Sequence, residues 1–235
     1  ANEMLYQSKA DVIMGCSAPD AGYDGEPYTP STTSSRLQYI GGWDTYQDFL
    51  DGIVENNGTL SVADADGDGT PDPWTVIREK SQFEALATGP TPKRLLGVPR
   101  VYQTLQYYRS PIYSQAAAYV DPFIPNMPNL ADMTKAALNV LDNNEKGFFL
   151  MVEGGAVDWA GHFNQPGRLI EEQVDFNRAV EAVVKWVGTN SNWAETTLIV
   201  TADHETGFIW GPGSNPTFEP IINNGKGQMP GMQFY

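Results

Sequence analysis

The chain has 235 residues, of which 41% are hydrophobic and 18% charged, and its formal net charge is -15 at pH 7. This length fits one α/β domain, or a core with a modest appendage, and the composition argues against a disordered chain. The negative charge works against nucleic acid as a partner, and no apolar run approaches the roughly 18 residues of a membrane helix. We therefore expect neither nucleic acid nor a membrane as a partner. The negative charge does not exclude a small phosphate ester as a partner, because bound metal cations invert the local field.

Cys16 is the only cysteine, so the chain cannot form an internal disulfide. Without a second thiol we expect Cys16 to be a small packed residue and not a nucleophile. The N-terminal residues have neither a basic segment nor an apolar core, so no signal peptide is visible.

The first half of the chain predicts short elements separated by long irregular stretches. Apolar runs and helical periodicity predict strands at 11–15, 74–77 and 94–98 and helices at 43–54 and 81–88. Residues 17–35 are rich in Pro, Gly, Ser and Thr, and residues 99–128 contain five prolines, so both stretches are predicted to be loops.

The second half has a cleaner pattern. Asn129 can cap a helix that runs to about Leu141, and a helix from about 166 to 187 begins at a proline and ends before a glycine. Apolar runs at 147–152 and 196–202 predict two buried strands on either side of the second helix. Strand, helix and strand form a βαβ unit with parallel strands, so the fold class is α/β.

The C-terminal part of the chain gives two weaker indications, one of structure and one of a binding surface. Residues 211–235 are rich in Gly and Pro and are predicted to be loop. Trp193, Phe208 and Trp210 can line a substrate entrance, although aromatic side chains near strand ends more often pack into the interior.

Five polar residues follow the two predicted strands. Glu153 ends the first strand, with Asp158 and His162 shortly after it, and Asp203 and His204 end the second strand. The carboxyl ends of neighbouring parallel strands lie at the same edge of a sheet, so these residues are expected to converge there. Solvated loop residues at strand ends are the plainer interpretation.

The distribution of histidines favours a metal site over that interpretation. The chain has only two histidines, and both lie in these two segments. Asp158 and His162 are four residues apart, one helical turn, and can face one ion together. Carboxylate oxygen with imidazole nitrogen suits zinc, while Mg²⁺ prefers a neighbouring site made of oxygen alone.

Two of these segments resemble the metal-binding signatures of alkaline phosphatases. The first is Glu-Lys-Gly-Phe-Phe-Leu-Met-Val-Glu-Gly-Gly at 145–155 with Asp-Trp-Ala-Gly-His at 158–162, and the second is Thr-Ala-Asp-His-Glu-Thr at 201–206. The helix segments 171–172 and 175–180 are similar to that family, and 10–15 and 93–97 are more weakly similar. Either signature alone would indicate only the wider superfamily, which includes sulfatases and phosphodiesterases.

The resemblance implies a metal-dependent hydrolase of phosphate monoesters that works through a phosphoserine intermediate. Asp158 and His162 would bind one zinc, Asp203 and His204 a second zinc, and Glu153 a nearby magnesium. It also implies a secreted or periplasmic enzyme, possible homodimers, and a three-layer α/β/α sandwich with a mostly parallel sheet and a loop-rich crown-like insertion. The corresponding division is 1–16 as a core strand region, 17–128 as insertion and peripheral strands, and 129–235 as the metal-binding α/β core.

The chain departs from the family pattern in several places. Nothing in it matches the family's serine nucleophile, bridging aspartate, threonine ligand or phosphate-binding arginine, and no histidine follows His204 to serve as the third zinc histidine. Trp159 stands at a position that varies in the family and influences metal preference. We expect an internal fragment of a longer protein, nearly inactive alone. The alternative hypotheses are a phosphodiesterase or sulfatase of the same superfamily, and a calcium-binding module without catalysis.

A second candidate site is acidic. Asp64, Asp66, Asp68 and Asp72 have a spacing that can wrap alternate oxygens around one Ca²⁺, but Thr75 stands where a bidentate glutamate would be expected. A solvated Asp-Gly turn explains the same residues equally well.

Overall fold

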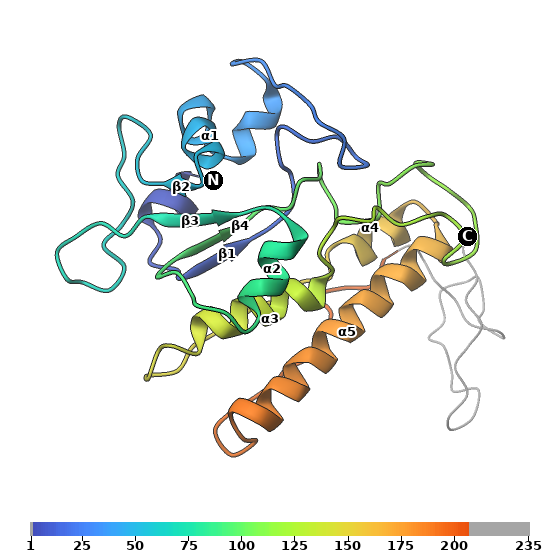
Figure 1. Cartoon of the computed structure of the whole chain (residues 1–235). Coiled ribbons are helices and arrows are strands. Elements are labelled where there is room, and N and C mark those ends of the chain that lie inside the picture. The colour runs from blue at the N-terminus through green and yellow to red at the C-terminus, as the bar shows by residue number, and fades with distance from the viewer. Residues whose placement is uncertain (1, 207–235) are drawn as a thin grey trace.

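The computed structural model describes residues 2–206, and its centre is a four-stranded sheet (Figure 1). The strands, in spatial order, are β1 (Val12–Met14), β4 (Leu95–Gly97), β3 (Trp74–Ile77) and β2 (Ile53–Val54). β1 and β3 both run parallel to β4, and β2 pairs antiparallel with β3. The predicted α/β class, with a mostly parallel sheet, is confirmed.

Helices cover this sheet and extend beyond it. They are the π-helix η1 (Glu3–Gln7), the 3-10 helix η2 (Ser35–Tyr39), and the α-helices α1 (Trp43–Leu50), α2 (Lys80–Leu86), α3 (Leu130–Leu141), α4 (Ala156–His162) and α5 (Pro166–Asn190). In the part of the chain that the structure describes, none of them is long and apolar enough to cross a bilayer.

The sheet has a hydrophobic core on each face, which makes three layers. Alternate residues of a strand point to opposite faces, so in β4 Leu96 joins a core with η1, η2 and α1, while Leu95 joins a core with α2 and α3. In β3, Val76 and Ile77 divide in the same way. Figure 1 accordingly shows α1 on one side of the sheet and α2 and α3 on the other.

The predicted cap of α3 is confirmed. The Asn129 side chain accepts a hydrogen bond from the Asp132 backbone N–H at 2.8 Å, and the Asp132 carboxylate accepts one from the Asn129 N–H. Such a cap satisfies N–H groups that have no partner inside the helix. α5 begins at the predicted proline, continues to Asn190, and packs against α3 and α4.

The two strands predicted at 147–152 and 196–202 are wrong. Within residues 2–206 neither segment pairs with a strand, and several of their apolar side chains are exposed: Phe149 is 89% exposed and Ile199 78%. Each segment has strand-forming residues, but a strand also needs a neighbouring strand to pair its backbone groups. The βαβ unit inferred from them is therefore absent from the described sheet.

Loop predictions divide into two groups. Residues 99–128 contain no helix or strand, as predicted. The predicted loop at 211–235, together with Phe208 and Trp210, lies outside the described residues.

Candidate metal centre

The first candidate pair of metal ligands lies on α4. Asp158 Oδ2 is 3.4 Å from His162 Nε2, because residues four apart share one face of a helix. α4 begins directly after Gly154 and Gly155, and a Cβ at Gly154 would lie 3.1 Å from the Phe176 side chain. A side chain at that position would therefore disturb the packing of α4 on α5.

The second candidate pair consists of neighbours in the chain. His204 Nε2 is 3.5 Å from Asp203 Oδ2, and His204 Nδ1 is 2.8 Å from the Glu205 carbonyl oxygen, to which it can donate. The pKa of His204 is raised, first by this carbonyl, then by Asp203, with a smaller contribution from Asp158. With Nδ1 engaged by the carbonyl, Nε2 is the nitrogen left for an external ligand.

The two pairs belong to segments that touch. A Cβ built on Gly161 would lie 2.4 Å from Thr206 Cγ2, so the 203–206 segment rests directly on α4. This close approach requires a glycine at position 161. Glu153 is exposed and lies three residues before the start of α4.

The donor groups fit a divalent cation. Asp158 Oδ1 is buried and has no hydrogen-bond partner within residues 2–206, and a buried carboxylate oxygen left unpaired is costly unless a cation or donor satisfies it. Together with imidazole nitrogen, it gives the mixed oxygen and nitrogen set that zinc accepts.

The five predicted ligands are not drawn into one compact cluster. Among residues 2–206, the one group of three or more His, Cys, Asp or Glu whose ligand atoms all lie within 4.8 Å of one another is Asp64, Asp66 and Asp72. The Asp–His pairs form locally, and the segments that lead into them are not aligned by a shared sheet.

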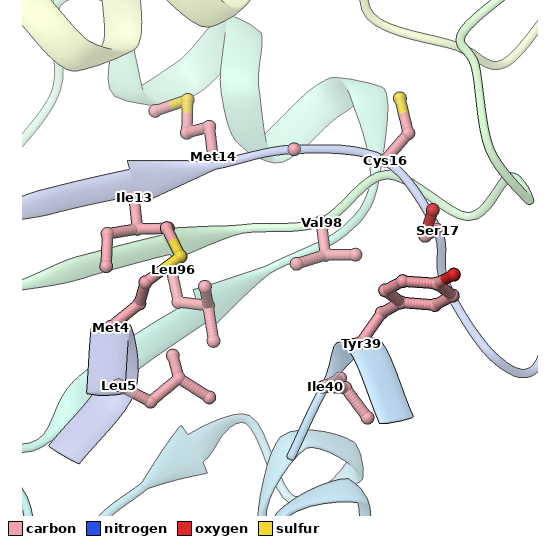
Figure 2. A pocket seen from close by; sticks show the side chains of 11 residues that line it. Met4, Leu5, Ile13, Met14, Cys16, Ser17, Tyr39, Ile40, Leu96 and Val98 are labelled. Carbon is pink, nitrogen blue, oxygen red and sulfur yellow. The ribbon is translucent and has the colours of Figure 1, made fainter. Parts of the chain in front are cut away.

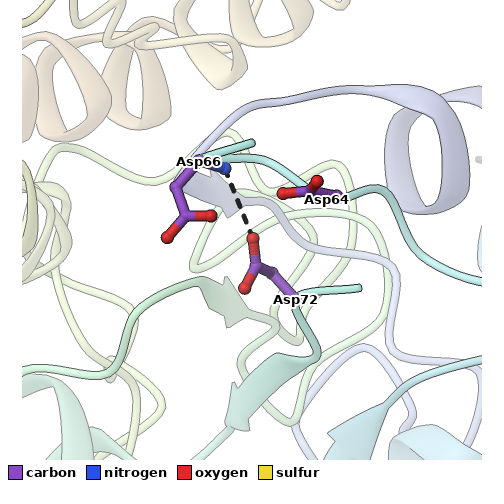
Figure 3. Close-up of side chains that lie close together, drawn as sticks. All are labelled: Asp64, Asp66 and Asp72. Carbon is purple, nitrogen blue, oxygen red and sulfur yellow. Dashed lines mark hydrogen bonds between the residues drawn. The ribbon is translucent and has the colours of Figure 1, made fainter. Parts of the chain in front are cut away.

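Asp64, Asp66 and Asp72 of the acidic loop lie close together (Figure 3), and the ammonium group of Lys93 contacts this loop. Lys93 Nζ lies 2.6 Å from Asp66 Oδ2 and 2.5 Å from Asp72 Oδ1, with Asp68 Oδ2 further away at 3.7 Å. These carboxylates raise the pKa of Lys93, mainly through the contacts with Asp66 and Asp72. Calcium binding by Asp64, Asp66, Asp68 and Asp72 stays a prediction, and the ion would compete with the ammonium group.

A cavity of about 190 Å³ lies apart from these acidic groups (Figure 2). It is lined by Met4, Leu5, Ile13, Met14, Gly15, Cys16, Ser17, Tyr39, Ile40, Leu96 and Val98. It has no charged side chain with which to bind a phosphate group. Burial raises the pKa of Cys16 to about 12, which keeps the thiol neutral and agrees with the expected packing role.

One unusual carboxyl group was not singled out from the sequence. Glu172 on α5 has a buried Oε1 with no hydrogen-bond partner among the described residues, and burial, followed by repulsion from Asp175, raises its pKa to about 8. Its neighbour Glu171 has partners for both oxygens: Oε2 meets Arg109 and Arg168, and Oε1 accepts from the Tyr119 backbone N–H. The sequence shows two adjacent glutamates and no signal that separates them.

Comparisons with known proteins agree on one family. A family model described as alkaline phosphatase matches residues 75–234. Alkaline phosphatase 4 of Bacillus subtilis is 40% identical over 102 residues, which cover 42% of this chain and 22% of that protein. Alkaline phosphatase of Escherichia coli K12 is 43% identical over 79 residues, covering 34% of this chain and 16% of the relative.

A solved structure is also similar. It is the cold-active alkaline phosphatase of a psychrophilic Shewanella species, with a TM-score of 0.37 and 18% identity over 76% of this chain and 40% of that one. The part of the chain that matches alkaline phosphatase 4 of Bacillus subtilis spans about a fifth of that protein's length.

Proposed function

Because the chain belongs to the alkaline phosphatase family, we propose that it carries metal-binding residues of a hydrolase that acts on phosphate monoesters. The observation that supports this most directly is the Asp158–His162 pair on α4, where the buried Oδ1 of Asp158 meets no hydrogen-bond donor among the residues that the structure describes.

Each proposed ligand has a distinct role. Asp158 and His162 hold one zinc, Asp203 and His204 hold a second, and Glu153 holds a magnesium ion. When bound, such ions neutralise the charge of the transferring phosphoryl group and activate the attacking oxygen. The chain itself fixes the donors: the Glu205 carbonyl orients the His204 ring, and the helix holds Asp158 and His162 on one face.

The finer parts of the proposal follow the family. The intermediate is a phosphoserine whose serine lies outside these 235 residues, so the chain alone hydrolyses little substrate. The complete enzyme is secreted or periplasmic and forms homodimers. Phosphodiesters and sulfate esters are the rival substrates.

The test uses the complete protein that contains this chain, with p-nitrophenyl phosphate, its diester and the sulfate ester as substrates. Asp158→Ala and His162→Ala are expected to lower kcat/KM for the monoester by about 100-fold or more, since even outer-shell partners of a metal are worth roughly 10- to 100-fold. Asp142→Ala, at the exposed end of α3, is the matched control and should leave kcat/KM unchanged. Faster turnover of the diester or the sulfate would assign a different substrate, and full activity of both variants would reject the metal site.

A further inference from the structure

A loop of the insertion, residues 106–122, packs against the junction between α4 and α5. Gly167, in the first turn of α5, approaches the loop so closely that a Cβ there would lie 2.2 Å from the Ala116 carbonyl oxygen. Gln165, which is 1% exposed, donates from Nε2 to the Ser114 carbonyl at 2.9 Å. The loop therefore fixes where α4 ends and α5 begins.

A buried carboxylate forms the centre of this contact. Glu171 Oε2 accepts a hydrogen bond from Arg109 Nη2 at 2.8 Å and lies 3.5 Å from Arg168 Nη1. Its other oxygen, Oε1, accepts from the Tyr119 backbone N–H at 2.7 Å. The side chains of Arg109, Glu171 and Arg168 are at most 3% exposed. Removing one partner of such a group leaves buried charge uncompensated, which is far more costly than losing a surface ion pair.

The arginines also hold the loop in shape. Arg109 donates from Nε to the Pro122 carbonyl at 2.9 Å and from Nη1 to the Gln106 carbonyl at 3.1 Å. Arg168 Nη2 lies 3.0 Å from Asp121 Oδ2. The guanidinium groups thus connect both ends of the loop to α5, and their fixed planar geometry makes these contacts directional.

Aromatic rings of the 106–122 loop also pack against rings on α4 and directly after it. The Trp159 ring lies edge-on to Tyr108 at a centroid distance of 5.4 Å and to Tyr107 at 6.3 Å, and Phe163 lies 4.9 Å from Tyr113. Trp159 and Phe163 directly follow Asp158 and His162 in the sequence. The rings therefore restrain the two positions next to the proposed ligands.

We propose that residues 106–122 act as a positioning clamp, anchored by Glu171 and Gln165, which holds Asp158 and His162 in the geometry that a metal ion requires. This inference rests on the proposed function of the α4 pair. Metal sites bind tightly when surrounding residues fix the orientation of the ligands. Glu171 and Gln165 touch neither metal nor substrate, so they are positioning residues.

The test is a Co²⁺ titration of the purified complete protein that contains this chain, followed by visible absorption. Wild type is compared with the variants Glu171→Gln and Gln165→Met. Both variants are expected to raise the dissociation constant of Co²⁺ by about 10- to 100-fold and to alter the visible band. Gln165→Met removes only a neutral hydrogen bond, so it keeps the test decisive if Glu171→Gln fails to fold.

Asp20→Asn is the matched control, because Asp20 forms another ion pair that is mostly shielded from solvent, with Arg78 directly after β3. It should lower the Tm but leave Co²⁺ affinity and the visible band unchanged. Wild-type affinity in folded Glu171→Gln or in Gln165→Met would overturn the clamp, as would an equal loss in Asp20→Asn. An Asp158→Ala variant that binds Co²⁺ like wild type would instead overturn the α4 metal site.

Discussion

At the residue scale, two adjacent glutamates on α5 have opposite surroundings. Glu171 is held by two arginines and a backbone N–H. Glu172 has a buried oxygen that meets no donor in the part of the chain that the structure describes, and its pKa is raised to about 8, first by burial and then by Asp175. Burial favours the neutral acid at Glu172, whereas Glu171 forms ion pairs with arginines.

The raised pKa of Glu172 gives stability a defined pH dependence. Between about pH 4.5, the ordinary pKa of a glutamate, and about pH 8, the folded state holds a proton that the unfolded state has lost. The free energy of unfolding therefore falls as the pH rises through this window. Glu172→Gln removes the titrating group, so its Tm should decline less steeply between pH 5 and 8 than that of wild type.

Thermal unfolding followed by circular dichroism across this range checks the prediction. Glu181→Gln is a suitable control on the same helix, because Glu181 is exposed and its pKa is lowered by Lys185. Parallel Tm curves for wild type and Glu172→Gln would show that Glu172 is ionised in the folded state.

At the element scale, the 148–152 and 197–202 segments are apolar but do not pair with any strand of the described residues 2–206. Met151 is 74% exposed and Val200 54%, whereas the sheet strands β3 and β4 bury most of their side chains. A backbone without partners opens freely to solvent.

Hydrogen exchange tests whether these segments are unpaired in the 235-residue chain. Amides at 148–152 and 197–202 are expected to exchange as fast as those in the 99–128 loop, while those of Val76 and Leu95, which bond within the sheet region, are protected. Mass spectrometry of peptides from a deuterium pulse resolves the difference. Protection of either segment at the level of β3 would mean that it forms a strand.

These elements show which parts of the fold the sequence predicts. The cap of α3, the proline at the start of α5, and β1, β3 and β4 were all predictable, because caps and apolar periodicity act over a few residues. Strand pairing depends on residues far away in the chain, so propensity alone led to the wrong result at 147–152.

At the scale of the whole molecule, the local distances in the candidate site could be predicted from the sequence, whereas its long-range contacts could not. The Asp158–His162 and Asp203–His204 distances are set by neighbours in the chain, and the sequence spacing anticipates both. The contact of Arg109 with Glu171 spans 62 residues, and no local pattern marks which arginine meets which carboxylate. The metal assignments themselves stay predictions.

The excess of negative charge acts on the molecule as a whole. With 29 acidic and 14 basic residues, the chain has a net charge of -15, and mutual repulsion of that size destabilises a compact state. Salt screens exposed charges strongly, with a Debye length of about 30 Å at 0.01 M and about 10 Å at 0.1 M, but it screens buried pairs far less. The buried contacts of Arg109 and Arg168 with Glu171 should therefore keep their strength while the surface repulsion fades.

Raising NaCl from 0.01 to 0.3 M is accordingly expected to raise the Tm. A gain of about 1 kcal/mol corresponds to roughly 2–4 °C in a protein of this size. Scanning calorimetry at fixed pH measures the shift, and NaCl is preferable to sulfate because sulfate also strengthens the burial of apolar groups. A Tm that falls with NaCl would mean that attractive surface pairs, such as Lys185 with Glu181 and Lys93 with Asp66, outweigh the repulsion among the remaining carboxylates.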